Sequence, residues 1–173
     1  MTETGEYLVG AYLRLVEECD FVDYNVRLAG GGLEGLREID VIGLNFDTHA
    51  AFICEVITHL SGTLYRSHDE TVNRVEQKYA WARRYAETRL VSFTTQQFQL
   101  WAPYVTPKLE QGLKAIDPGL VLVINDQYRS RVEELMGLAR LKKEDVGNPF
   151  FRGLQIIQHL RGPKNRAGAW SWK

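Results

Sequence analysis

Apolar residues recur at helical spacing near the start of the chain, over residues 4–18. The positions that match one buried helix face, at i, i+3, i+4 and i+7, are Leu8, Ala11, Tyr12 and Leu15. Residues 21–28 then have the pattern of a strand, and the glycine-rich segment 29–35 that of a loop. This loop lacks the strand-glycine-helix order of a phosphate-binding fingerprint. The opening of the chain is therefore predicted to be helix, strand and loop.

Two short apolar segments, residues 38–43 and 52–57, follow the glycine-rich loop. The stretch between them, residues 45–49, is short and rich in turn formers, which predicts an antiparallel hairpin. Each segment carries one acid, Asp40 in the first and Glu55 in the second. Two carboxylates on neighbouring strands suit a hard cation such as Mg²⁺, which is bound through one or two acids, water and substrate phosphate. The structural alternative is that both acids pair with arginines.

A second helix is predicted from Ser67 to about residue 87, because Ser67 and Glu70 match a capping box. Its predicted buried stripe consists of Val72, Val75, Tyr79, Ala82 and Ala86. At about 100° per residue, Lys78 falls on the shoulder of that stripe, so its side chain should border the core.

The rest of the chain alternates between strand and helix patterns. The predicted elements are a strand over either 90–93 or 97–104, a helix with Pro107 in its first turn, a strand over 120–125, a helix through Val132, Leu135, Met136 and Ala139, and a last helix that begins at Asn148-Pro149. The complete order predicts an α/β fold, a mixed β-sheet flanked by helices.

Composition favours one globular domain over residues 1–173, with 45% hydrophobic and 25% charged residues. No apolar run approaches the roughly 18 residues of a membrane span, and the first residues are polar and acidic, so we expect a cytoplasmic protein with no membrane partner. Cys19 and Cys54 lie in apolar segments without metal-ligand spacing, which predicts reduced core residues.

The net charge of −1 conceals a basic C-terminus. No acid follows Asp145, whereas five basic residues do, namely Arg152, Arg161, Lys164, Arg166 and Lys173. Trp170 and Trp172 stand among these charges as candidate stacking groups for nucleic acid. The alternative is a solvated tail.

The sequence resembles the core of the PD-(D/E)XK nuclease superfamily over roughly residues 5–104, especially its Holliday-junction-resolvase-like and RecB-like branches. That family has a Glu in the first helix, an Asp opening the second strand and Glu-X-Lys in the third. Glu6, Asp40 and Glu55 match these three acids. The resemblance implies a restriction-endonuclease-like αβββαβ core, with residues 105–173 as a C-terminal α/β extension.

The family lysine is missing, because Ile57 occupies its position and no lysine precedes Lys78. Lysine migration into the following helix occurs among such nucleases, so the resemblance implies Lys78 as the displaced catalytic lysine. The structural alternative is that the stem of Lys78 covers apolar surface while its charge meets solvent. His59 alternates onto the same face as Glu55 if the strand extends that far, as an accessory ligand or proton acceptor. A lone histidine at a strand end is more often structural.

Taken together, the resemblance implies a metal-dependent deoxyribonuclease, an endonuclease or exonuclease, with Mg²⁺ as cofactor and Mn²⁺ as substitute. The catalytic residues would be Asp40, Glu55 and Lys78, the first two also binding the metal, with Glu6 and His59 as accessory groups. The residues expected to contact DNA are Arg27, Arg74, Arg152, Arg161, Lys164 and Arg166. Many such nucleases act as dimers, so a homodimer is expected.

Two other functions stay open at this stage. One is a catalytically inactive protein of nuclease-like fold that binds nucleic acid, as the missing motif lysine permits. The other is an interaction protein that docks onto a partner through Trp101, Trp170 and Trp172. Salt-dependent DNA binding without cleavage would favour the first.

Overall fold

The computed structural model describes residues 2–27, 38–60 and 65–161. In chain order the elements are α1 (Thr4–Leu15), β1 (Phe21–Arg27), β2 (Glu38–Asn45), β3 (Ala50–Val56), α2 (His68–Arg89), β4 (Thr95–Ala102), α3 (Pro107–Lys114), β5 (Leu120–Ile124), α4 (Asn125–Leu141) and α5 (Pro149–Arg161). No helix in these described ranges is long and apolar enough to cross a membrane. The predicted glycine-rich loop 29–35 lies outside the described residues.

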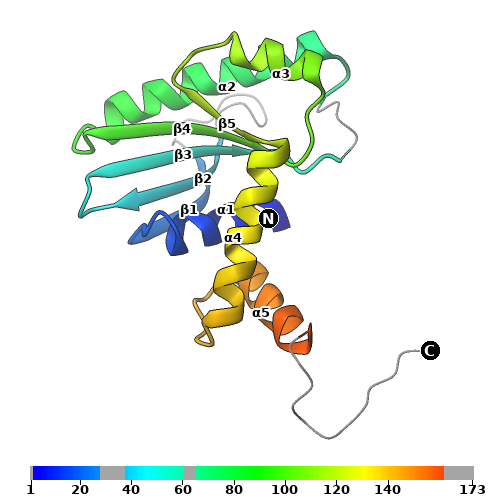
Figure 1. The fold of residues 1–173 in the computed structure, drawn as a ribbon. Helices are drawn as coiled ribbons and strands as arrows, with labels where there is room; N and C mark the ends of the chain where they lie inside the picture. Colours follow the sequence, from blue (N-terminus) through cyan, green and yellow to red (C-terminus); the bar gives the residue numbers. More distant parts are fainter. Residues whose placement is uncertain (1, 28–37, 61–64, 162–173) are drawn as a thin grey trace, which may run out of the picture.

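The five strands form one sheet in the order β1-β2-β3-β4-β5 (Figure 1). The first three pair antiparallel, and β4 and β5 then continue the sheet in parallel with β3. This confirms the predicted mixed sheet and the predicted hairpin between residues 38–43 and 52–57. Residues beyond 104 supply β5, so the same sheet runs from the expected core into the expected extension.

Helices cover both faces of the sheet (Figure 1). On one face α1, α4 and α5 pack on a cluster that includes Val41, Cys54 and Trp101. On the other face α2 and α3 pack on two clusters that contain Ile53 and Leu100. Because side chains alternate between the faces of a strand, neighbouring residues of β3 belong to different layers. Cys54 and Glu55 therefore face opposite sides.

Both predicted N-cap residues cap their helices, although at α2 only the Ser67 half of the predicted capping box is found among the hydrogen bonds of the described residues. The hydroxyl of Ser67 accepts a hydrogen bond from the N–H of Glu70 (3.1 Å), and α2 begins at the next residue. The Asn148 side chain accepts from the N–H of Phe151 (2.9 Å) in front of α5. Of the two strands considered for residues 90–104, the second is observed as β4, and 90–93 is wrong because those residues only connect α2 to the sheet.

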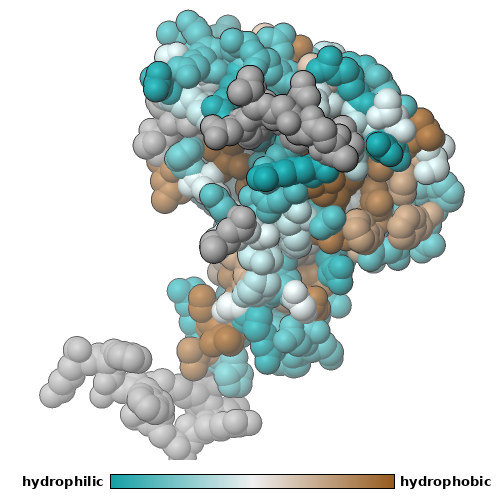
Figure 2. Space-filling model, turned by 180° about the vertical axis from the view of Figure 1, so that it is seen from behind, coloured by the Kyte–Doolittle hydropathy of each residue, from teal (hydrophilic) through white to brown (hydrophobic). Residues whose placement is uncertain are grey.

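The helices α4 and α5 extend below the sheet as a projection, and Figure 2 shows apolar side chains gathered on it. The inner side of α5 is anchored to the body by Asn148, whose Nδ2 donates to the Tyr7 carbonyl (2.8 Å). The outward side carries Ile156, Ile157 and Leu160, which are exposed. The packed part of α5 thus lies on the side of α1, across the sheet from α2.

Candidate active site

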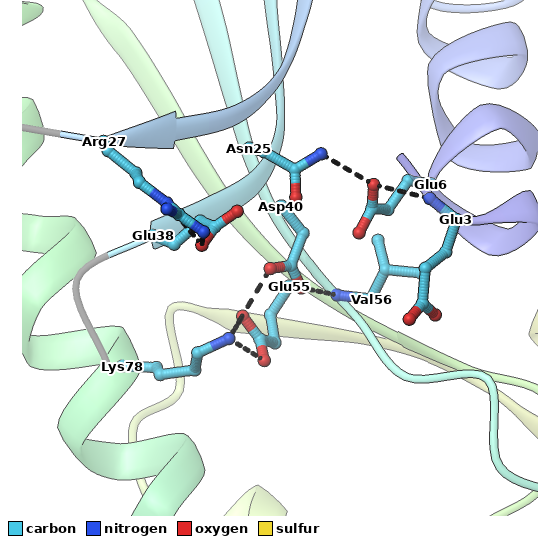
Figure 3. Close-up of polar contacts among 9 residues, drawn as sticks. All are labelled: Glu3, Glu6, Asn25, Arg27, Glu38, Asp40, Glu55, Val56 and Lys78. Atoms are coloured by element: carbon cyan, nitrogen blue, oxygen red, sulfur yellow. Dashed lines mark hydrogen bonds and ion pairs between the residues drawn. The ribbon is translucent and has the colours of Figure 1, made fainter. Parts of the chain in front are cut away.

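The sheet register brings Asp40 and Glu55 together. Val41 pairs with Cys54 in the antiparallel β2–β3 ladder, so one step along the strands sets Asp40 against Glu55 on the face covered by α2. Figure 3 shows the two carboxylates side by side. The predicted meeting of these two acids is therefore found in the structure.

The positive charge between the two acids comes from α2. The Lys78 Nζ lies 2.5 Å from both carboxylate oxygens of Glu55 and 3.6 Å from Oδ1 of Asp40 (Figure 3). The side chain of Lys78 is only 12% exposed, so it does not merely cover apolar surface with its charge in solvent. The structure thus places Lys78 beside the two acids, and their partner is this lysine instead of an arginine.

Asp40 is also held by the backbone of β3. Its Oδ2 accepts a hydrogen bond from the N–H of Val56 (2.8 Å), directly after Glu55. This bond fixes the carboxylate across the end of the hairpin, so that Oδ1 is left facing Lys78. The position of Asp40 is therefore set by two strands at once.

Two acids share one ammonium in this buried cluster, and their protonation reflects it. Burial raises the pKa of Glu55 to about 8, and the negative charge of Asp40 adds to the rise, while Lys78 opposes it. Burial lowers the pKa of Lys78, but the charges of Glu55 and Asp40 outweigh burial, so its pKa is raised overall. The lysine is therefore charged at neutral pH. When both acids are ionised, the two carboxylates and the one ammonium leave the cluster with one net negative charge.

Glu6 lies on α1 close to this cluster, although its carboxylate is already occupied. Its Oε2 accepts hydrogen bonds from the backbone N–H of Glu3 and from Nδ2 of Asn25, each 3.0 Å long. Burial raises the pKa of Glu6, and Asp40 adds to the rise through its charge. Glu6 is thus within electrostatic reach of Asp40 and is oriented by Asn25, a residue that the sequence analysis did not single out.

The residues after β3 differ from the expectation. The strand ends at Val56, so it does not extend to His59, which is exposed. Among the described residues no hydrogen bond or ion pair joins His59 to Asp40 or Glu55. The accessory role predicted for His59 depended on a longer strand, and that condition is not met.

Arg27 and Arg74, two of the arginines expected to contact DNA, differ in their exposure and in the groups that they contact. Arg27 is exposed and pairs with Glu38 (2.6 Å), so its charge is partly neutralised. Arg74 lies one turn before Lys78 on α2, with its guanidinium 4.4 Å from the ring centre of Tyr65. Its Nε is buried, and within the described part of the chain it has no hydrogen-bond partner. Arg74 is therefore the arginine with an unmet donor near the site.

The C-terminal basic residues lie elsewhere. Arg152 bonds Gln155 within α5 (3.1 Å), and Arg161 is exposed at the end of that helix, across the sheet from Lys78. Lys164, Arg166, Trp170 and Trp172 lie outside the described residues. The expectation that Trp101 is exposed is wrong, because its ring is fully buried against Tyr12 and Tyr128. Trp101 therefore contributes to the core and not to a docking surface.

Tyr65 is a second residue near the site, besides Asn25, that the sequence analysis did not single out. Burial raises the pKa of its hydroxyl, and the charge of Glu55 adds to the rise. Its backbone N–H donates to the Thr71 hydroxyl (3.2 Å), which ties it to the start of α2. No sequence signal distinguishes this tyrosine from the others, since its position follows only from the packing of α2 on the sheet.

The site holds two carboxylates within contact of one lysine, and in the described ranges no group of three or more His, Cys, Asp or Glu side chains could together hold a metal ion. A cavity of about 30 Å³, enough for one water molecule, borders Glu55 and Lys78.

No family model, curated protein or solved structure matches the chain.

Proposed function

We propose that the protein is a metal-dependent nuclease that hydrolyses phosphodiester bonds of DNA. The observation that supports it best is the contact of Lys78 with both Glu55 and Asp40 (Figure 3). Two strand acids and a neighbouring ammonium are the groups that such hydrolysis requires, and here they come from three separate elements. The resemblance to the PD-(D/E)XK superfamily remains part of this proposal.

The donor set fits Mg²⁺ or Mn²⁺. Hard cations prefer oxygen ligands, and Mg²⁺ in phosphate chemistry is commonly held by only one or two carboxylates with water and substrate completing its shell. Asp40 and Glu55 would hold it; burial and the charge of Asp40 raise the pKa of Glu55, and a bound divalent cation would favour its ionised form. The bound ion would polarise the phosphate and lower the pKa of a bound water.

The protein side chains have separate tasks in this scheme. Asp40 stays fixed by the Val56 N–H, so it keeps its orientation when the charge around it changes. With a metal ion also bound to Glu55, the ammonium of Lys78 would be less fully paired with that carboxylate. It would then hold the attacking water and stabilise the negative charge that develops on the phosphate. The guanidinium of Arg74, 4.4 Å from the ring centre of Tyr65 and one turn from Lys78, supplies a positive charge that suits a neighbouring phosphate.

A second candidate function is a binding protein of the same fold without hydrolysis. It is favoured by one feature, because Lys78 contacts both oxygens of Glu55 and so occupies the groups that a metal would need. DNA would then be the partner without being cut. A homodimer stays a prediction under either function.

The test is cleavage of branched, single-stranded and duplex DNA with Mg²⁺ or Mn²⁺ by the full chain. Wild type should cut at least one of these substrates, and Asp40→Asn and Glu55→Gln should each lose at least about 100-fold in rate while their circular dichroism spectra stay unchanged. Glu110→Gln, which removes an acid from the exposed surface pair with Lys114, is the matched control. Metal-independent cutting, or DNA binding without cutting, would reject the proposal.

A further inference from the structure

A second and much larger cavity lies at the carboxyl ends of β4 and β5. Its volume is about 450 Å³, against about 30 Å³ for the cavity beside Lys78. Its walls are the segment after β4, including Tyr104, and the first turn of α4, with Asn125, Tyr128 and the opposite charges of Asp126 and Arg129. A volume of this size is in the range of small-ligand sites, so it can take a group as large as a nucleotide.

The cavity lies at the same end of the parallel strands as the candidate active site, with the wall from α4 on the opposite face of the sheet from Lys78. Glu55 pairs with Leu100 in the parallel β3–β4 ladder, and Pro103 follows Leu100 by three positions. Neighbouring strands are about 4.8 Å apart, so β5 lies roughly 10 Å from β3. Pro103 also lies three residues, roughly 10 Å, further along the strand direction, so the separation is roughly 14 Å, and about four stacked nucleotides at 3.4 Å each would span it.

The walls of the cavity are held together by Asn125, which has a left-handed backbone (φ 53°) at the start of α4. Its Nδ2 donates to the carbonyl of Val105 (3.0 Å), and its Oδ1 accepts from the N–H of the same residue (2.9 Å). This pair of bonds joins the segment after β4 to the end of β5. The cavity is therefore bounded by a fixed frame, which lowers the ordering cost of binding.

The lining groups suit a flat base with an attached phosphate. Tyr104 is 48% exposed, so a large part of its ring is free to stack. Tyr128 is held edge-on against Trp101, with ring centres 6.1 Å apart. The Arg129 side chain is 72% exposed, and its contact with the exposed Asp126 (3.4 Å) is a weak surface pair that a phosphate can replace.

From these observations we infer that the cavity binds an unpaired nucleotide of the substrate, a few positions from the bond that is cut. The base stacks on Tyr104, and Arg129 contacts its phosphate. Stacking on Tyr104 needs a free base face, which a base stacked within a duplex does not offer, so the site favours DNA with a single-stranded segment. This inference rests on the proposed nuclease function for the position of the cut, while nucleotide binding itself does not depend on hydrolysis.

The test uses the full chain carrying Asp40→Asn and measures fluorescence anisotropy with two DNA hairpins, one blunt and one with a four-nucleotide single-stranded extension. Stacking of one base is worth about 1–3 kcal/mol, so Tyr104→Ala should weaken binding of the extended hairpin about five- to 150-fold and change the blunt hairpin less than about twofold. Tyr104→Trp should restore binding, because it keeps a stacking ring. Arg129→Ala should show a smaller loss with the same preference.

Arg84→Ala is the matched control for Arg129, since it removes one exposed positive charge from α2, away from the cavity. Equal affinity of Tyr104→Ala and its parent for the extended hairpin overturns the nucleotide site, even where the wild type cuts DNA. An equal loss on both hairpins also overturns it. If wild type cuts nothing, a selective loss with Tyr104→Ala still supports the nucleotide site, and only the hydrolytic function fails.

Discussion

The Nζ of Lys78 lies 2.5 Å from both carboxylate oxygens of Glu55, although the two residues are 23 positions apart and belong to different layers of the fold. The helix α2, which packs on the sheet, thus supplies a positive charge next to Glu55, because β3 itself contains no basic residue. A side chain from α2 approaches Glu55 from above the sheet, whereas residue 57, two positions after Glu55, lies just beyond the end of β3. The geometry of the site therefore depends on how α2 docks.

Replacement of Lys78 should lower the rate at which the protein cleaves DNA. We expect Lys78→Met to lower the cleavage rate by about 100- to 1,000-fold, because the loss of one group that stabilises transition-state charge has that effect. Lys78→Arg should retain part of the rate. The measurement is single-turnover cleavage with Mg²⁺, with Lys114→Met, which removes an exposed lysine, as control. A Lys78→Met variant that cuts at the wild-type rate would assign the lysine a structural role.

The stability of the protein should depend on pH through Glu55. Its pKa is raised from 4.5 to about 8, so the folded state holds a proton that the unfolded state releases. The stabilisation is fully present below pH 4.5 and is lost as the pH rises through about 8, and the rise in pKa corresponds to at most about 5 kcal/mol.

Urea unfolding of wild type without metal should therefore show a free energy of unfolding that falls between pH 5 and 8. Glu55→Gln, which remains neutral, should flatten this part of the profile. The same slope in both proteins would mean that other groups cause it.

The sequence predicted the hairpin and its two acids because both strands are short apolar segments with a turn-rich connection. It also placed Lys78 at the border of the buried face of α2, since helical periodicity fixes that angle. The contact of Lys78 with Glu55 needed the resemblance as well, because periodicity does not say which strand a helix covers.

Other parts of the site could not be read from the sequence. His59 was predicted from strand alternation, which holds only as far as the strand, and β3 ends at Val56. Asn25 and Tyr65 reach the site through tertiary packing, and neither stands in a recognisable local pattern. Trp101 was expected at the surface, but it lies in β4 and its ring packs in the core against Tyr12 and Tyr128, which are distant in the sequence.

Ile57 directly follows β3 and stands where the PD-(D/E)XK pattern, which the sequence resembles, has a lysine. Its side chain is 5% exposed and packs in the cluster that contains Val75 and Leu100. We expect Ile57→Lys to lower the free energy of unfolding by about 3 kcal/mol or more, because an ammonium would be buried among apolar groups. Ile57→Leu should cost less than about 1.5 kcal/mol. Chemical denaturation measures both, and a mild effect of Ile57→Lys would show that the position tolerates the charge.

Metal binding should stabilise the protein in a pH-dependent way. A divalent ion requires ionised carboxylates, so it competes with the proton on Glu55. We expect millimolar Mg²⁺ or Mn²⁺ to raise the melting temperature more at pH 8 than at pH 6. Asp40→Asn should lose most of this increase, whereas Glu110→Gln should keep it. An equal increase in all three proteins would indicate nonspecific ion binding.

The packing of α1 on the sheet should tolerate no side chain at Gly10. A Cβ at this position would overlap the phenol ring of Tyr24 on β1, whereas a Cβ at Gly137 on α4 would meet nothing within 4 Å. Both glycines lie inside helices, where alanine is intrinsically favoured by about 1 kcal/mol. We therefore expect Gly137→Ala to raise the free energy of unfolding and Gly10→Ala to lower it by about 1–3 kcal/mol, the usual cost of overpacking.

Gly10→Ala should also lower activity, because it would displace α1, which carries Glu6. It would also displace Tyr24, the neighbour in β1 of Asn25, whose side chain donates a hydrogen bond to Glu6. Urea denaturation and cleavage rates of the two variants provide the comparison. If both alanines raise stability equally, the close approach of α1 to β1 is not present in solution, and the placement of Glu6 beside Asp40 loses its support.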